Sequence, residues 1–98
     1  MRAALALAAE APSETSGLER RLAQDPKDLD ARFDYAKALA GQGRFADAVD
    51  QLLAIVEADR DWNEQAARKQ LLTIFEAAGA TSEVAKAGRR RLSSILFS

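Results

Sequence analysis

The sequence predicts an all-α domain built from antiparallel helix hairpins, and three observations lead to this fold class. Apolar residues recur at the three-and-four spacing of amphipathic helices along most of the 98-residue chain. No stretch alternates with the period of two that a half-buried strand requires. Only two prolines and five glycines interrupt the chain, and much of its 48% apolar content is alanine, which favours helices.

The composition also limits the function. A chain of 98 residues can form one domain with a thin core and is too short for two. It has no cysteine and no histidine, so it lacks a sulfur nucleophile, the usual zinc ligands and the common general base. Carboxylates on neighbouring turns, such as Asp28, Asp30 and Asp34, are more often solvated than catalytic. We therefore expect no enzyme activity, no cofactor and no metal.

The charge is unevenly distributed along the chain. The formal net charge is −1, but residues 86–98 contain four basic and no acidic groups, which leaves 10 basic against 15 acidic groups, or −5, for residues 1–85. A pI of about 5.4 is too low for a broad nucleic-acid-binding face. No segment approaches the roughly 20 apolar residues of a membrane span. We expect protein partners, without nucleic acid or membrane.

The first residues, "MRAALALAAEAP", could be read as a secretory signal because Arg2 precedes an apolar run. That run is short and mostly alanine, and Glu10 follows it directly. We expect residues 1–12 to be the remnant of a terminal helix or a disordered lead, followed by one domain over residues 13–98. The expected location is the cytoplasm.

The first helix of this domain should cover residues 13–24. Either Ser13 or Ser16 can cap it, and Ser16 has the spacing of a capping box with Glu19. The segment "DPKD", residues 25–28, then closes this helix and opens the next one. Proline is tolerated in a first turn, and aspartate accepts hydrogen bonds from the orphan amide groups there.

Residues 29–58 have the pattern of a helix hairpin. Apolar positions from Leu29 to Ala40 cover more than one side of the first helix, so it should pack on two neighbours. The segment "GQGR", residues 41–44, is a stop signal that is too short for anything but an antiparallel connection. The second helix then carries one apolar stripe, which consists of Phe45, Ala48, Val49, Leu52, Ile55 and Val56.

Residues 62–97 repeat this plan. Asp61 and Glu64 have the spacing of a capping box for a helix that ends at Gly79. Its predicted buried stripe consists of Ala67, Leu71, Ile74, Phe75 and Ala78. The last helix should start after the cap candidates Thr81 and Ser82, with an apolar face that consists of Val84, Ala85, Gly88, Leu92, Ile95 and Leu96. Glycine inside a helix costs about 1 kcal/mol relative to alanine, so Gly88 should mark a close helix crossing.

The two halves are spaced like repeats. Asp25 and Asp59 each end a helix and lie 34 residues apart, which is the period of a tetratricopeptide unit. The segment between them resembles that repeat, with Gly43 at the inter-helix turn and Ala48 where the two helices touch. It departs from the pattern at Arg32, where the repeat usually has a large aromatic residue. The resemblance implies tetratricopeptide hairpins that form a fragment of a right-handed α-solenoid.

The second half is similar to the C-terminal tetratricopeptide region of bacterial thioredoxin-like co-chaperones, the chaperedoxin family. The matching residues are Trp62, Ala67, Arg68, Leu71, Leu72, Phe75, Glu76, Arg90, Arg91 and Leu92. The family's thioredoxin domain and its redox cysteines have no counterpart in this sequence. The resemblance implies a protein-interaction module that docks on unfolded clients and on a chaperone of the chaperonin or heat-shock type, with the C-terminal helix as the docking element.

Two surfaces are candidate binding sites. The basic cluster, the apolar end and the resemblance together assign partner binding to Arg89, Arg90, Arg91, Leu92, Ile95, Leu96 and Phe97. A possible groove for an extended segment is formed by Asp30, Phe33 and Lys37, although Phe33 is equally plausible as core. Trp62 is expected to be a core residue rather than a binding hot spot. Two alternatives stay open, a plain capping helix and a scaffold or homodimer without a chaperone role.

Overall fold

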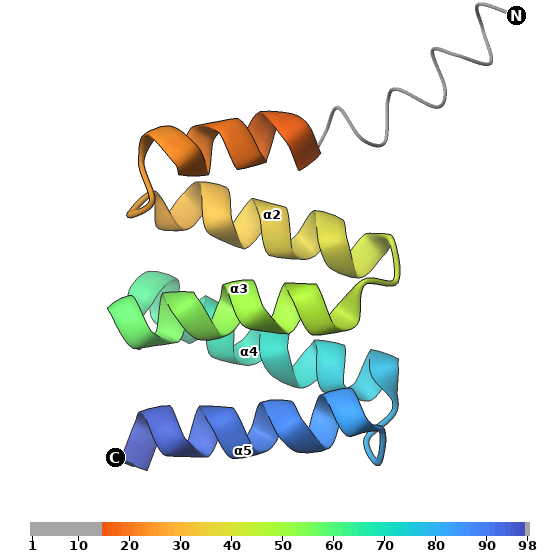
Figure 1. Cartoon of the computed structure of the whole chain (residues 1–98). Helices are drawn as coiled ribbons and strands as arrows, with labels where there is room; N and C mark the ends of the chain where they lie inside the picture. Colours follow the sequence, from red (N-terminus) through yellow and green to blue (C-terminus); the bar gives the residue numbers. More distant parts are fainter. Residues whose placement is uncertain (1–14, 98) are drawn as a thin grey trace, which may run out of the picture.

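The structure, a computed structural model, describes residues 15–97 (Figure 1). Within this range the chain forms five helices and no strand, so the all-α prediction is confirmed. The helices are residues 15–24, α2 (Leu29–Gly41), α3 (Phe45–Ala58), α4 (Trp62–Ala78) and α5 (Glu83–Phe97). The expectations for residues 1–12 and for Ser13 as a cap fall outside the described residues.

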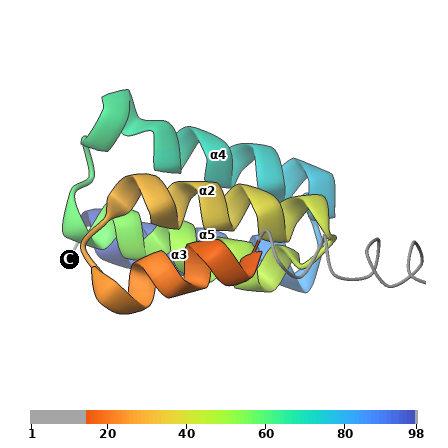
Figure 2. The same cartoon turned by 90° about the horizontal axis from the view of Figure 1, so that it is seen from above.

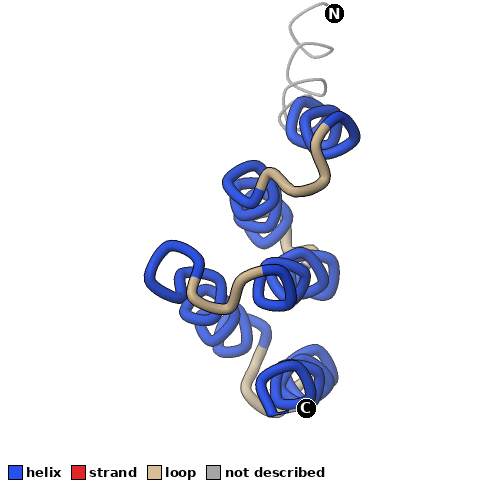
Figure 3. The backbone as a smooth tube through the Cα atoms, turned by 90° about the vertical axis from the view of Figure 1, so that its left-hand side faces the viewer, coloured by secondary structure: helices blue, strands red, loops and turns tan. Residues whose placement is uncertain are grey.

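The helices form two layers. Consecutive helices run antiparallel, and α2 and α4 lie on one side of the array while residues 15–24, α3 and α5 lie on the other (Figures 1 and 3). Seen from above, α4 lies at the outer edge beyond α2 (Figure 2). The central helix is α3, which packs against α2, α4 and α5, and α4 also packs against α5. This alternation is the arrangement expected of stacked helix hairpins.

The core lies between the two layers and is made mainly of aliphatic side chains. The predicted α3 stripe is buried apart from the half-buried Phe45, and Leu53 joins it. Ala48 has no exposed surface, as a close contact between the hairpin helices requires. The core cluster consists of Ala36, Leu39, Ala48, Val49, Leu52, Leu53, Ile55, Val56, Ala67, Leu71, Ile74, Phe75, Ala85 and Leu92.

Several helix ends follow the predicted local chemistry. The N-cap of α2 is Asp28, whose Oδ1 accepts a hydrogen bond from the Ala31 backbone N–H at 3.0 Å. At the turn after α2, Gly43 has a φ of +81°, a left-handed value that favours glycine. Before α5, the Ser82 hydroxyl accepts a hydrogen bond from the Ala85 N–H at 3.2 Å. The predicted hairpin turn and the predicted start of the last helix are therefore confirmed.

Two predicted capping boxes are wrong. Ser16 already lies inside a helix, because the chain is helical from residue 15 onward. The Asp61 side chain makes no capping hydrogen bond, and the next residues, Asn63, Glu64 and Gln65, have left-handed φ values of 50°, 56° and 64°. A capping box needs a right-handed first turn, so Glu64 cannot complete one.

The left-handed turn at residues 63–65 follows a residue that packs against α2. Left-handed backbone costs roughly 1–2 kcal/mol for each residue with a side chain. Trp62, which directly precedes the turn, packs its ring against Phe33 of α2 with ring centroids 5.3 Å apart. This aromatic contact offsets part of the backbone cost and ties the start of α4 to α2.

Candidate functional site

The apolar residues of the predicted docking surface do not share one environment. Leu92 belongs to the core and is only 7% exposed, which corrects its assignment as a docking residue. The physical reason is its position on the inner face of α5, in one stripe with the buried Ala85 and Gly88. Ile95 and Leu96 are half-buried and pack against the core. Only Phe97, 83% exposed, is fully available to a partner.

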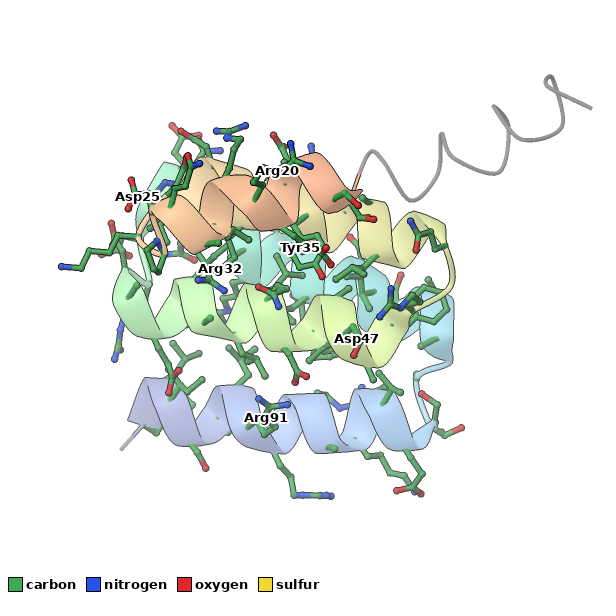
Figure 4. The ribbon with its side chains drawn as sticks, turned by 45° about the horizontal axis from the view of Figure 1, so that its top comes forward. Arg20, Asp25, Arg32, Tyr35, Asp47 and Arg91 are labelled. Carbon is green, nitrogen blue, oxygen red and sulfur yellow. The ribbon has the colours of Figure 1, made fainter. Side chains whose placement is uncertain are left out.

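The three consecutive arginines also differ from one another. Arg89 donates from Nη2 to the Ala80 carbonyl oxygen at 2.6 Å, and its guanidinium lies 5.9 Å from the centroid of the Phe75 ring. Arg91 Nη1 lies 2.6 Å from Asp50 Oδ1, which ties α5 to α3 (Figure 4). Within residues 15–97, Arg90 makes no hydrogen bond or ion pair. Two of the arginines therefore stabilise α5, and the third is available to a partner.

The end of α5 is held by a residue that the sequence did not single out. Arg60, in the loop before α4, donates to the carbonyl oxygens of Leu96 at 3.3 Å and Ile95 at 3.4 Å. These are last-turn carbonyls, which have no partner inside the helix. No local signal could have revealed this contact, because 35 and 36 residues separate the partners. Arg60 therefore links the last described turn of α5 to the loop before α4.

The outer face of α5 is polar along most of its length. Lys86, Arg90, Ser93 and Phe97 follow one another at helical spacing, and all four are exposed. The first three give the polar outer face that a terminal helix of a solenoid needs, as the capping-helix alternative requires. Phe97 interrupts this polarity.

The three predicted groove residues lie on one face of α2. Phe33 is half-buried, packs against the core and contacts Trp62. Lys37 Nζ lies 5.0 Å from the centroid of the Phe33 ring and 3.7 Å from Asp34 Oδ1. Asp30 is exposed. The face therefore combines an aromatic pair with one cation and exposed carboxylates, and both aromatic rings also serve the core.

Arg32, which stands where the repeat usually has a large aromatic residue, makes hydrogen bonds to neighbouring elements. Its Nη1 donates to Gln51 Oε1 at 2.7 Å and its Nη2 donates to the Pro26 carbonyl oxygen at 2.9 Å, which joins α2 to α3 and to the preceding loop (Figure 4). A cavity of about 370 Å³ lies beside it and is lined by Pro26, Lys27, Leu29, Arg32, Ala54 and Ala58. The Arg32 guanidinium thus links α2, α3 and the preceding loop by hydrogen bonds, where an aromatic ring would pack between them.

The described residues show neither metal-ligand clusters nor membrane-spanning helices, and their shifted pKa values include that of Asp28. Residues 15–97 contain no group of three acidic, histidine or cysteine side chains placed to hold a metal ion. None of the helices in this range is long and apolar enough to cross a bilayer. The Ala31 N–H and then the Arg21 guanidinium lower the pKa of Asp28, and this shift belongs to a helix cap rather than to a reactive group.

Comparison with known proteins agrees with the geometry. A family model described as tetratricopeptide repeat matches residues 8–97. Searches of curated proteins and of solved structures found no match. The family match covers nearly the whole chain, and the two-layer array of antiparallel hairpins is the arrangement that such repeats produce. The chain belongs to the tetratricopeptide repeat family, whose domains generally mediate protein–protein interaction.

Proposed function

We propose that this domain is the non-catalytic protein-binding module of a cytoplasmic thioredoxin-like co-chaperone. It docks on unfolded clients and on a chaperone of the chaperonin or heat-shock type. Membership of the tetratricopeptide repeat family supports a protein-binding role, and the residues between Trp62 and Leu92 that resemble the chaperedoxin family support the co-chaperone role.

The observation that carries the proposal is the exposure of Phe97 at the end of a helix that packs on the core. A phenylalanine that is 83% exposed gains free energy when a partner covers it. The buried Ala85, Gly88 and Leu92 pack α5 on the core, so the partner does not have to order this helix on binding. Arg90, next to the same face, supplies a charge for an acidic partner group.

The docking surface proposed here is narrower than the one expected from the sequence. Phe97 and Arg90 are its centre, and the half-buried Ile95 and Leu96 form its edge. Arg89 and Arg91 keep their internal bonds and contribute mainly electrostatic potential. The α2 face with Asp30, Phe33 and Lys37 is proposed as a second surface, which would hold an extended apolar segment of a client.

A homodimer or generic scaffold is the second candidate, and the same exposed phenylalanine favours it. Two copies that met through Phe97 would form a symmetric contact. The basic residues Lys86 and Arg90 of both copies would then face each other, which opposes the contact at low salt.

The experiment compares binding and self-association in the same variants. Purified chaperonin is titrated with the chain, with Phe97→Ser and with Arg90→Glu, and Lys27→Glu serves as a charge control on a distant loop. We expect both α5 variants to weaken chaperonin binding by about tenfold and the control to leave it unchanged.

Sedimentation velocity of the same samples separates the two candidates. A dimer that Phe97→Ser dissociates, together with unchanged chaperonin binding, would replace the co-chaperone proposal by the scaffold one. Deleting residues 93–98 tests the capping alternative, because a cap alone would lower the melting temperature and leave chaperonin binding intact.

A further inference from the structure

The α4/α5 pair is the last hairpin of the described array, and one of its sides has no helix stacked on it (Figure 3). The two exposed large apolar side chains of residues 15–97, Leu72 at 49% and Phe97 at 83%, both belong to this pair. In the preceding hairpin, α2/α3, the corresponding side is covered, because α4 and α5 pack against α3. The open side is therefore a candidate surface for a further partner.

Two stripes flank the seam between these helices. Arg68, Leu72 and Phe75 follow one another at positions i, i+4 and i+7 of α4. Arg89, Ser93 and Leu96 have the same spacing on α5. The stripes therefore run side by side over about two helical turns.

The contacts fix the register of the stripes. At one end the Arg89 guanidinium lies 5.9 Å from the Phe75 ring centroid. At the other end Arg68 and Leu96 line the same cavity of about 40 Å³. Because the helices are antiparallel, Leu72 lies between these two contacts along the length of α4. An exposed leucine thus occupies the middle of a seam with a cation near each end.

The charge on this pair selects the chemistry of the occupant. Exposed basic residues outnumber exposed acidic ones on α4 and α5, with Arg68, Lys69, Lys86, Arg89, Arg90 and Arg91 against Glu64, Glu76 and Glu83. A second copy would bring the same excess of positive charge to the contact, which is unfavourable. A partner with acidic residues is favoured by the same field.

The repeat geometry selects the conformation of the occupant. Within the array, α4 packs on α3 and touches α2 through the Trp62–Phe33 contact, so each added element is a helix laid along the preceding hairpin. A helix laid along the α4/α5 pair would continue this stacking. Its apolar stripe would cover Leu72.

We propose that the seam between α4 and α5 binds an acidic amphipathic α-helix of a partner protein. Apolar residues at three-and-four spacing cover Leu72, Leu96 and Phe97, and carboxylates on both flanks meet Arg68 on one side and Arg90 on the other. The inference rests on the proposed function only in that the domain binds protein. It names the chemistry of the partner, and it adds Leu72 and Arg68 of α4 to the contact.

The test uses a labelled synthetic peptide of about four helical turns, with leucines at three-and-four spacing and glutamates on both flanks. Two control peptides are used, one with the same composition in a scrambled order and one with lysine in place of glutamate. Fluorescence anisotropy follows binding to the whole chain. We expect the first peptide to bind at least about tenfold more tightly than either control, and added salt to weaken its binding.

Variants locate the site. Leu72→Ser and Arg68→Glu should each weaken peptide binding by about tenfold, while Lys27→Glu leaves it unchanged. Leu72 and Arg68 are exposed, so circular dichroism and the melting temperature should stay close to those of the unchanged chain. In NMR spectra, addition of the peptide should change the backbone amide chemical shifts of residues 68–75 and 89–97 and leave those of residues 30–37 unchanged.

Three results would overturn the inference. The first is equally tight binding of the scrambled peptide, and the second is a set of chemical-shift changes located in α2. The third is a dimer of the unchanged chain that Leu72→Ser dissociates. A different result would contradict the proposed function without contradicting the seam assignment. If chaperonin binding is absent while the acidic peptide binds the seam, the co-chaperone role is wrong and the seam assignment stands.

Discussion

Gly88 of α5 lies directly against the Phe75 ring of α4. A Cβ atom at position 88 would stand 2.5 Å from Phe75 Cε1 and 2.8 Å from Cζ, and it would stand 3.4 Å from a Val49 methyl group of α3. The Phe75 ring is buried and cannot move aside freely. The absence of a side chain at Gly88 therefore sets how closely α5 approaches the two helices beneath it.

Gly88→Ala should destabilise the domain, although alanine is the better helix former. Overpacking typically costs about 1–3 kcal/mol, and the gain in helix propensity of about 1 kcal/mol offsets only part of it. Urea denaturation measures the difference. Gly17→Ala is the matched control, because no atom lies within 4 Å of a Cβ built there. Equal stability of the two variants would show that Phe75 has room to move.

Ala48→Leu should push the helices of the first hairpin apart. Ala48 has no exposed surface, so three added carbon atoms have no free space and the expected cost is about 1–3 kcal/mol. Ala46, exposed in the same helix, provides the control variant Ala46→Leu, which should change stability little. A thermal melt that Ala48→Leu does not alter would contradict the tight contact.

Asp28→Asn should remove one source of acid sensitivity while keeping the helix cap, because asparagine caps as well as aspartate. The pKa of Asp28 is lowered in the folded state, first by the hydrogen bond from Ala31 N–H and then by Arg21. Its stabilising contribution is therefore present above the unfolded pKa of about 3.9 and is lost as the pH falls through the lower folded value.

The free energies of unfolding of the unchanged chain and the variant, measured in urea from pH 6 to pH 3, test this sign. The advantage of the unchanged chain should be constant at the upper end and shrink below about pH 4. An advantage that grows on acidification would mean that the folded state raises the pKa instead.

Phe33→Leu should be visible in the emission of Trp62, the single tryptophan of the chain. The two rings lie 5.3 Å apart at an angle of 57°, and losing the aromatic partner opens the half-buried indole to water. We expect a red-shifted emission maximum and a lower melting temperature. Leu72→Ser, which removes an exposed side chain from the same helix as Trp62, should leave the emission unchanged and serves as the comparison.

Local signals in the sequence specify the helices and their order. The apolar periodicity of each segment, Gly43 and Gly79 at positive φ after two helices, and Asp28 and Ser82 at the start of two others are local signals. They act within one or two turns, so they can be read without knowing the fold. The 34-residue spacing from Asp25 to Asp59 added the pairing of these helices into hairpins.

The roles of individual side chains on those helices depend on packing between distant segments. Leu92 and Phe97 both looked like docking residues, yet one is core and the other is exposed, because the side chains packed around α5 decide which of its faces is covered. Arg60 meets Ile95 and Leu96, and Arg91 meets Asp50, at separations of 35 to 41 residues that no local pattern encodes. The left-handed turn at residues 63–65 likewise accompanies a contact with α2, far away in the sequence. Local patterns specify which residues can form a helix, whereas partners are chosen by packing between segments distant in the chain.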